Sequence, residues 1–141
     1  MYVTYDPKKI MISLGAHVVT GYGEGTFVSI EPKGEGVTSK TGCDGETVRS
    51  LDPNESMTIS LTLLQNSPTI GWCQDRYDMD KATGGEGMFP ILIQDLKGGL
   101  IFSANHAWVV NSPSREFGKE AGEREIVIET GRATVKGETS K

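Results

Sequence analysis

The sequence is poor in the residues from which most catalytic and metal sites are built. It has only 2 cysteines and 2 histidines in 141 residues. Cys43 and Cys73 lie far apart with no C-x-x-C spacing, and His17 and His106 fall in separate predicted strands. A zinc site would need ligands gathered from unrelated segments. We therefore expect two free thiols in a reducing compartment, and neither a metal nor any other cofactor.

Basic residues and long apolar runs are scarce as well. Lys and Arg number 14 against 19 Asp and Glu, a formal net charge of −5, and no basic cluster offsets this excess. Such a surface repels a phosphate backbone, so tight nucleic-acid binding is disfavoured. No apolar segment approaches the roughly 18 residues needed to cross a bilayer, and residues 1–7 lack the features of a secretory signal. We expect neither a membrane protein nor one exported by the ordinary route.

Segments that resemble catalytic or ligand-binding motifs lack the neighbouring elements or the spacing that those motifs require. The glycines of residues 21–25 precede a predicted strand, whereas a phosphate loop requires a helix N-terminus. The acidic residues from Asp75 to Glu86 lack the glycine and the final glutamate of a calcium loop. No serine lies in a G-x-S-x-G elbow, and neither histidine has a recognisable catalytic partner. The sequence therefore indicates a protein that is not an enzyme.

What is abundant points to β-structure. Glycine numbers 18, and threonine and serine are frequent, a balance typical of strands and turns. In residues 56–63 the apolar side chains alternate with Thr58, Ser60 and Thr62, which predicts a half-buried strand with a polar second face. Similar patterns predict strands over residues 10–14, 17–20, 26–31, 88–95, 100–110 and 124–135, the last with a bulge at Gly131. The predicted fold is mainly β, an antiparallel β-sandwich or barrel in a single domain over residues 1–141, with a flexible tail at 136–141.

One helix is predicted beside these strands. Ser67 and Pro68 supply an N-cap and a first-turn proline, and the segment 69–82 carries apolar residues at spacings of three and four. Gly84 and Gly85 end it. Trp72 on this helix, and Trp108 in the strand 100–110, favour core packing over a ligand platform.

The segment 33–55 differs from the rest of the chain. It is rich in glycine and charge, and Val37, Val48 and Leu51 are its only aliphatic residues. It therefore predicts a long projecting hairpin or loop that would have no core of its own. Its residues of both charge signs are suited to contacts between identical copies of the chain; they include Lys33, Glu35, Lys40, Asp44, Glu46 and Arg49.

Several segments, spread over nearly the whole chain, together resemble one known family. They are Tyr5-Asp6-Pro7-Lys8-Lys9, residues 25–31, the strand ending in Gln65-Asn66-Ser67-Pro68 before the helix, residues 89–96, and residues 112–120 with Phe117-Gly118-Lys119-Glu120. In this combination the chain resembles the tail tube proteins of contractile-tailed bacteriophages. The Trp72-Cys73 helix and the charged segment around Cys43-Asp44-Gly45 depart from that family.

The resemblance implies a specific assembly and specific partners. It implies hexameric rings with a closed inner β-barrel, stacked into a hollow tube inside a contractile sheath, through which DNA passes without specific binding. The implied partners are further copies of the chain and the sheath, tape-measure, baseplate and tail-terminator proteins. The implied location is the virion tail, assembled in the cytoplasm of the host bacterium. We expect strands 26–31, 57–64, 89–95 and 101–109 to pair as two hairpins that line the channel, with Thr58, Ser60 and Thr62 facing the lumen.

Two alternatives to the phage tube remain. One is the related tube protein of a secretion or contractile-injection apparatus, which would pass protein instead of DNA. The other, from a different class, is a monomeric β-sandwich module that binds a ligand through Trp72 or Trp108.

Overall fold

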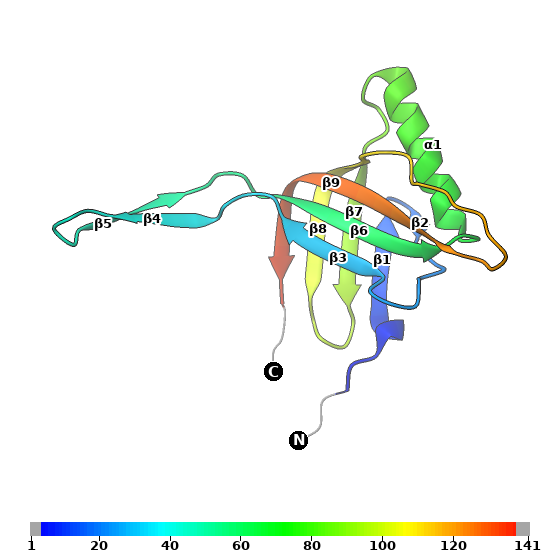
Figure 1. Cartoon of the computed structure of the whole chain (residues 1–141), viewed down its shortest axis with the longest axis horizontal. Helices are drawn as coiled ribbons and strands as arrows, with labels where there is room; N and C mark the ends of the chain where they lie inside the picture. Colours follow the sequence, from blue (N-terminus) through cyan, green and yellow to red (C-terminus); the bar gives the residue numbers. More distant parts are fainter. Residues whose placement is uncertain (1–3, 138–141) are drawn as a thin grey trace.

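A computed structural model describes residues 4–137 of the chain (Figure 1). It contains one α-helix, one short 3-10 helix and nine strands. In chain order they are η1 (Pro7–Lys9), β1 (Ile10–Leu14), β2 (His17–Val18), β3 (Val28–Pro32), β4 (Val37–Thr41), β5 (Thr47–Leu51), β6 (Ser56–Leu64), α1 (Pro68–Thr83), β7 (Phe89–Asp95), β8 (Ile101–Val109) and β9 (Glu123–Lys136). The prediction of a mainly β fold with one flanking helix is confirmed.

Seven of the strands form a single antiparallel sheet in the order β2-β1-β7-β8-β9-β6-β3, and β4 and β5 pair separately. The sheet bends at β9, which pairs with β6 through residues 123–132 and with β8 through residues 128–136. In Figure 1 the strands β1, β7 and β8 therefore run steeply, while β3 and β6 cross them. The bend encloses an apolar core between the two halves.

The core is built from the predicted alternation. Ile59, Leu61 and Leu63 of β6 are completely buried, as are Ile126 and Ile128 of the neighbouring strand β9. Full burial of one such side chain stabilises a fold by roughly 1.5–3 kcal/mol. This row of aliphatic side chains fixes which face of β6 and β9 points inward.

Strict alternation along residues 100–110 predicts that Phe102, Ala104, His106 and Trp108 share one face of β8, and this is wrong in the second half of the strand. Phe102 and Ala104 are buried, but the next buried residues are Ala107 and Val109. Between them the register against β7 shifts, since Ile91 lies opposite Ala104 and Phe89 opposite Ala107. This β-bulge inserts one residue and reverses the faces that follow it. As a result Trp108, predicted in the core, is half-buried on the opposite face.

A second bulge lies in β9, where it was predicted. Thr58 lies opposite Glu129 and Ser56 opposite Arg132, so β9 has an extra residue next to Gly131. The two bulges face each other across the β8–β9 pair, where Ala104 remains opposite Ala133 and Ala107 opposite Thr130. Together they accommodate the bend of the sheet.

The helix α1 covers one end of this sheet. The Ser67 side chain accepts a hydrogen bond from the Thr69 amide, and Gly84 ends the helix in the left-handed conformation, as the capping residues predicted. Thr69, Ile70 and Cys73 face the core. Trp72 is half-buried, with its ring 5.0 Å from that of Phe89.

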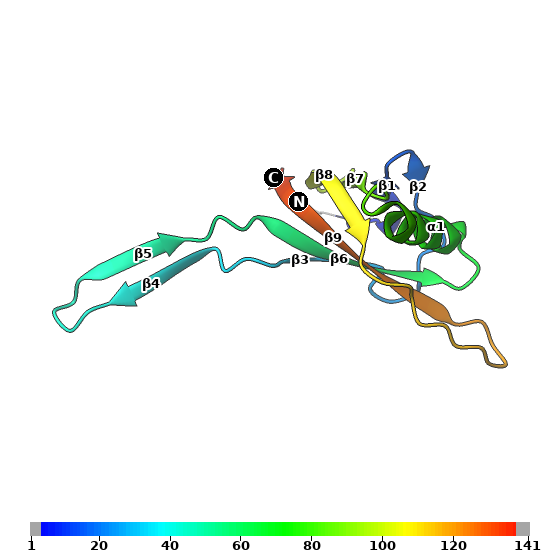
Figure 2. The same ribbon diagram turned by 90° about the horizontal axis from the view of Figure 1, so that it is seen from above.

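The hairpin of β4 and β5 projects far from the body of the protein (Figures 1 and 2). It continues the β3–β6 pair beyond a bend, and all its strand residues are exposed. The tail predicted over residues 136–141 falls mostly outside the described residues, and Lys136 is the last residue of β9.

Candidate assembly surfaces

The face of the β3–β6–β9 half-sheet that points away from the core is polar and acidic. Thr58, Ser60 and Thr62 alternate with the buried residues of β6 and so lie together on this outer face. Strand pairing adds side chains from β3 and β9. We call the resulting surface the polar face; it consists of Ser29, Glu31, Thr58, Ser60, Thr62, Glu123, Glu125 and Glu129, with the half-buried Val127 opposite Ser60 as its one aliphatic member.

Cross-strand rows organise the polar face. One row runs across four strands from Trp108 through Glu129 and Thr58 to Glu31. Glu129 forms an ion pair with Lys33, with 2.9 Å between Lys33 Nζ and Glu129 Oε1. The other carboxylates of the polar face have no ion pair among the described residues. The surface is therefore a mixture of small hydroxyl side chains and excess negative charge.

The structure changes the set of strands beside Thr58, Ser60 and Thr62. The two predicted hairpin pairs, β3 with β6 and β7 with β8, are both present. However, β9 lies between them, and β7 pairs with β1 on its other side. The strands adjoining the polar side chains of β6 are thus β3 and β9. The alternation of Glu125, Val127 and Glu129 with the buried isoleucines of β9 was the signal that could have identified this surface.

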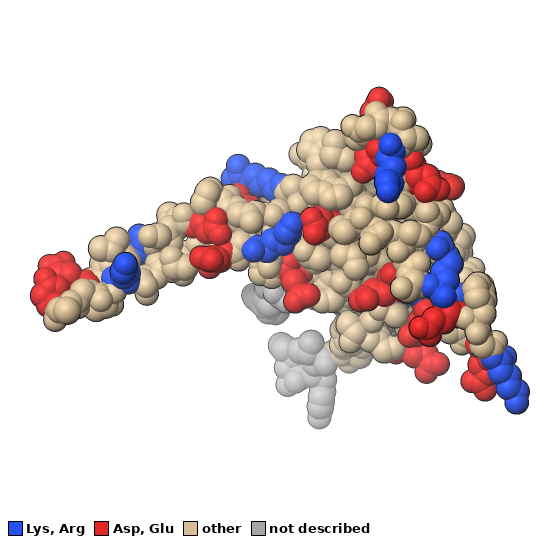
Figure 3. Space-filling view, turned by 45° about the horizontal axis from the view of Figure 1, so that its top comes forward, with Lys and Arg blue, Asp and Glu red and all other residues tan. Residues whose placement is uncertain are grey.

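The charged residues predicted in segment 33–55 separate into two groups. Lys33 and Glu35 lie at the base of the hairpin, beside the polar face, and Lys33 is already bound to Glu129. Asp44 and Glu46 lie in the turn between β4 and β5, and Lys40 and Arg49 lie on the strands behind it. Figure 3 shows acidic side chains at the outer end of the projection, with basic ones behind them.

Asp52 fastens the base of the hairpin. Its carboxylate accepts hydrogen bonds from the amides of Glu35, at 2.7 Å, and Asn54, at 3.0 Å. These two donors lower the pKa of the Asp52 carboxyl, because they stabilise its charged form. The Asp52 side chain thus helps to hold the bend between the body and the hairpin, together with the backbone bond from the Asp52 amide to the Gly36 carbonyl.

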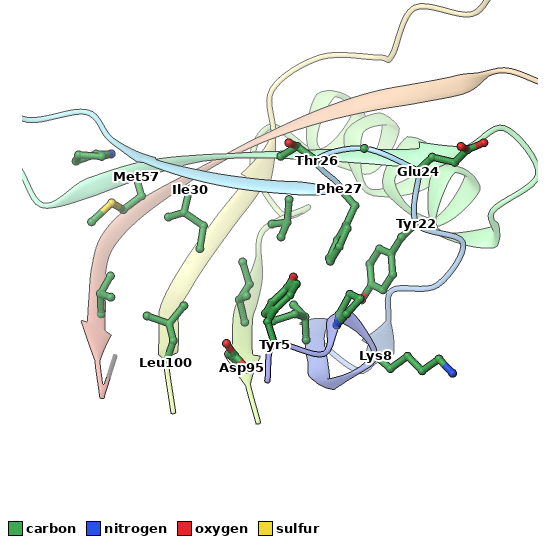
Figure 4. Close-up of a pocket in the computed structure, with 18 residues that line it drawn as sticks. Tyr5, Lys8, Tyr22, Glu24, Thr26, Phe27, Ile30, Met57, Asp95 and Leu100 are labelled. Carbon is green, nitrogen blue, oxygen red and sulfur yellow. The ribbon is translucent and has the colours of Figure 1, made fainter. Parts of the chain in front are cut away.

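A third surface is an apolar cavity of about 1170 Å³ between β3 and the opposite half of the sheet. Tyr22, Phe27, Ile30, Met57 and Leu100 project into it (Figure 4). The rings of Tyr22 and Phe27 are 4.6 Å apart. Burial raises the pKa of the Tyr22 hydroxyl, so this group is neutral at physiological pH.

The described residues give no sign of catalytic or metal chemistry. Residues 4–137 hold no cluster of His, Cys, Asp and Glu that could bind a metal ion. His17 is used structurally, since its Nε2 lies 2.8 Å from the Thr69 hydroxyl and its ring stacks on Trp72. Both cysteines are free, Cys43 exposed and Cys73 buried. No helix in the described part of the chain has the length and apolarity to cross a membrane.

Comparisons with known proteins give one related phage protein and a shared fold. No known family profile matches the chain. The chain is 26% identical over 132 residues to Structural protein ORF10 of Pseudomonas phage KPP10, which covers 89% of this chain and 76% of that protein. A chain from the sheath–tube complex of the extracellular contractile injection system PVC, in its extended state, superposes with a TM-score of 0.63 at 14% identity, covering 95% of this chain and 92% of that one. The chain has the fold of contractile-tail tube proteins.

The chain also matches a protein that lies at the end of a tube. The tube-terminating cap of the anti-feeding prophage matches with a TM-score of 0.62 at 12% identity over 97% of this chain and 93% of that one. The resemblance inferred from the sequence is confirmed by these findings. The prediction that the chain is not an enzyme is confirmed too, since the similar proteins are structural.

Proposed function

We propose that the protein assembles into hexameric rings that stack into the hollow tail tube of a contractile phage, with the polar face lining the channel through which DNA passes. The observation that carries this proposal is the polar face itself. Its hydroxyl and carboxylate side chains, interrupted by Val127 alone, cover the side of β3, β6 and β9 that faces away from the core.

The dimensions of such a tube suit DNA. Six chains that each contribute four strands make a barrel of 24. With strands about 4.8 Å apart and tilted by roughly 40°, the backbone diameter is about 48 Å. A duplex roughly 20 Å across passes once side chains are subtracted. The four adjacent strands that carry or flank the polar face are β8, β9, β6 and β3, so β9 takes the place of β7 in our proposed lining.

The charge of the polar face favours a conduit for DNA and disfavours a DNA-binding site. Glu31, Glu123 and Glu125 repel phosphates, while the hydroxyl groups between them offer no cation that would hold a nucleic acid. The DNA would therefore slide past this surface without being retained. A channel protein needs this lack of affinity.

Open strand edges support self-assembly. The outer edge of β3 has no strand partner among the described residues, and exposed edges promote pairing with another chain. Closure of a ring would satisfy this edge. In our proposal the tube lies inside a sheath, meets terminator, tape-measure and baseplate proteins at its ends or interior, and is assembled in the host cytoplasm into the virion tail.

Electron microscopy of the purified protein tests the assembly. Negative staining should show rings or tubes with a central channel, and light scattering should show a mass that grows with concentration. A monomer that persists at high concentration would refute the proposal and would favour a monomeric binding module.

Cysteine labelling tests the orientation of the polar face. Ser60→Cys in a Cys43→Ser background should react in free subunits with a maleimide coupled to a protein too wide for the channel, and should be protected in tubes. Asp75→Cys in the same background, on the exposed side of α1, is the matched control. It should be labelled equally in free subunits and in tubes. Equal labelling of Ser60→Cys in both states would place the polar face outside the channel.

A second candidate is the tube of a contractile injection apparatus, which the likeness to the PVC sheath–tube complex favours. It predicts the same rings and the same protected face. The two differ in cargo, so the contents of tubes isolated from the native particle, DNA or protein, distinguish them.

A further inference from the structure

The half-sheet of β1, β7 and β8 has a face of its own that points away from the core. In Figure 2 these strands lie along one side of the molecule, and β3 and β6 lie along the other. Successive side chains of a strand point to opposite sides of the sheet. The side chains of β1, β7 and β8 that alternate with the buried ones therefore point away from the polar face.

Strand pairing arranges these outward side chains in two rows. One row runs across four strands from Met11 through Gln94 and Ile101 to Lys136. The other row crosses five strands and contains no charged residue. We call the two rows together the acid-free face; the members of its second row are Val18, Ser13, Leu92, Ser103 and Thr134.

The aliphatic side chains of the acid-free face lie close to one another. Met11, Val18 and Ile101 are 42%, 53% and 42% exposed, and Leu92 is half-buried. Leu92 is a diagonal neighbour of both Met11 and Ile101 in the paired strands, a spacing that long side chains bridge. Single exposed aliphatic residues are common on protein surfaces, whereas a group of them marks an interaction site.

Charge distinguishes this face from the rest of the surface. The chain has 19 acidic residues, and the polar face carries several of them, but neither row of the acid-free face has any. Its one charged member, Lys136, lies at its edge and has no ion pair among the described residues. Depletion of charge together with exposed methionine is typical of the centre of a protein interface. A partner that fits presents aliphatic side chains, with a carboxylate near Lys136.

The direction of the acid-free face selects this partner. If the polar face lines the channel, the acid-free face lies on the outside of the tube. Neighbouring copies in a ring would instead meet at strand edges such as that of β3. The tube chain of similar fold from the PVC system is part of a sheath–tube complex, and a sheath also surrounds the tube in our proposed function.

We propose that the sheath protein binds the acid-free face, with aliphatic side chains packed on Met11, Leu92 and Ile101 and a carboxylate near Lys136. This inference rests on the proposed function. It assigns the contact to the half-sheet of β1, β7 and β8 and not to the charged exposed side of α1, which carries Asp75 and Asp78.

Two native methionines test this assignment without any substitution. Met11 on the acid-free face and Met79 on α1 are each 42% exposed. Brief treatment with hydrogen peroxide converts accessible methionine to its sulfoxide, and mass spectrometry locates the product. Both should react in bare tubes of the full-length protein. In intact sheathed particles the oxidation of Met11 should slow severalfold, whereas that of Met79 should be unchanged.

Insertion of acidic residues gives an independent readout. Met11→Glu with Ile101→Glu should lower the amount of purified sheath protein that sediments with tubes by roughly tenfold or more, because unpaired carboxylates would be buried in the contact. Met79→Glu is the matched control, since it replaces an equally exposed methionine, and it should leave sheath binding unchanged. The urea midpoint and the yield of tubes should stay the same in all these variants.

The outcomes separate this inference from the proposed function. If Met11 is already protected in bare tubes, the acid-free face lies between copies and the inference is overturned. It is overturned too if Met11 reacts equally with and without the sheath, or if Met79→Glu lowers sheath binding as much as the double substitution. If the wild type forms no rings or tubes at any concentration, the proposed function itself fails. Protection of Met11 by the sheath alone, with selective loss of binding in the double variant, supports both.

Discussion

The bent sheet and the β4–β5 hairpin are both antiparallel β-structure, but they are stabilised in different ways. In the sheet, strands such as β6 have every second side chain buried, whereas in β4 and β5 every residue is exposed. The sheet holds its shape through its own core. The hairpin continues two strands of that sheet and is held at its base by Asp52. The comparison teaches that the sheet carries the core that stabilises the single chain, whereas the hairpin has no core of its own.

Substitution of a core residue of the sheet should lower the free energy of unfolding more than any change in the hairpin. Phe102 is completely buried in β8, so Phe102→Ala removes a large side chain and leaves a cavity. We expect the free energy of unfolding to fall by about 3–5 kcal/mol. Urea denaturation followed by circular dichroism measures this fall. The matched substitution Val48→Ala in the hairpin should change the stability of the monomer by less than about 0.5 kcal/mol.

Removal of the hairpin should leave the stability of the single chain unchanged and should abolish polymerisation. Deletion of residues 36–49 takes away exposed strands that contribute nothing to the core. The truncated chain should keep its circular dichroism spectrum and its unfolding midpoint, and should lose polymerisation. Tubes of normal length and stability from the truncated chain would show that this segment is a tolerated insertion.

The two cysteines sharpen the comparison, since Cys43 lies in the hairpin turn and Cys73 faces the core of the sheet from helix α1. Burial raises the pKa of the Cys73 thiol to about 12, so at pH 8 almost none of it is the reactive thiolate. Cys43 is exposed in the hairpin turn. A coloured disulfide reagent should therefore titrate one thiol per chain rapidly and the second only in denaturant. Two thiols reacting at one rate would mean that the core opens readily.

The smallest expected effect concerns the junction between the two regions. Because the folded pKa of Asp52 is lowered below the ordinary value of 3.8, its contribution is present above that value and is lost as the pH falls through the lowered one. Amide exchange at Glu35 and Asn54 should accelerate, relative to other hairpin amides, as this carboxylate is protonated. Asp52→Ala should accelerate the same amides at pH 7 and leave global unfolding unchanged. If the exchange rates of both amides are unchanged by this substitution, Asp52 does not stabilise the bend.

The sequence predicted those parts of the fold that depend on local patterns. The alternation from Met57 to Leu63 identified both faces of β6, and Ser67 and Gly84 gave the ends of α1 to within about two residues. Both signals are carried by neighbouring residues.

The missed features depend on partners far away in the chain. The bulge that moves Trp108 to the outer face is defined by the register with β7 and β9. The strands β4 and β5 could not be distinguished from a loop because neither buries a face. The position of β9 between β6 and β8 left no mark in a single segment, so the glutamates of the polar face were not assigned to it.

The place of β9 has a consequence for the order of events during synthesis. It follows every other strand in the chain, yet it lies near the middle of the seven-stranded sheet. Until it emerges, β6 and β8 each have an unsatisfied edge, and the two halves of the sheet have nothing to join them. Long-range pairing of this kind is slow and exposes a nascent chain to wrong partners. The same delay keeps the polar face incomplete until the last strand of the chain has paired.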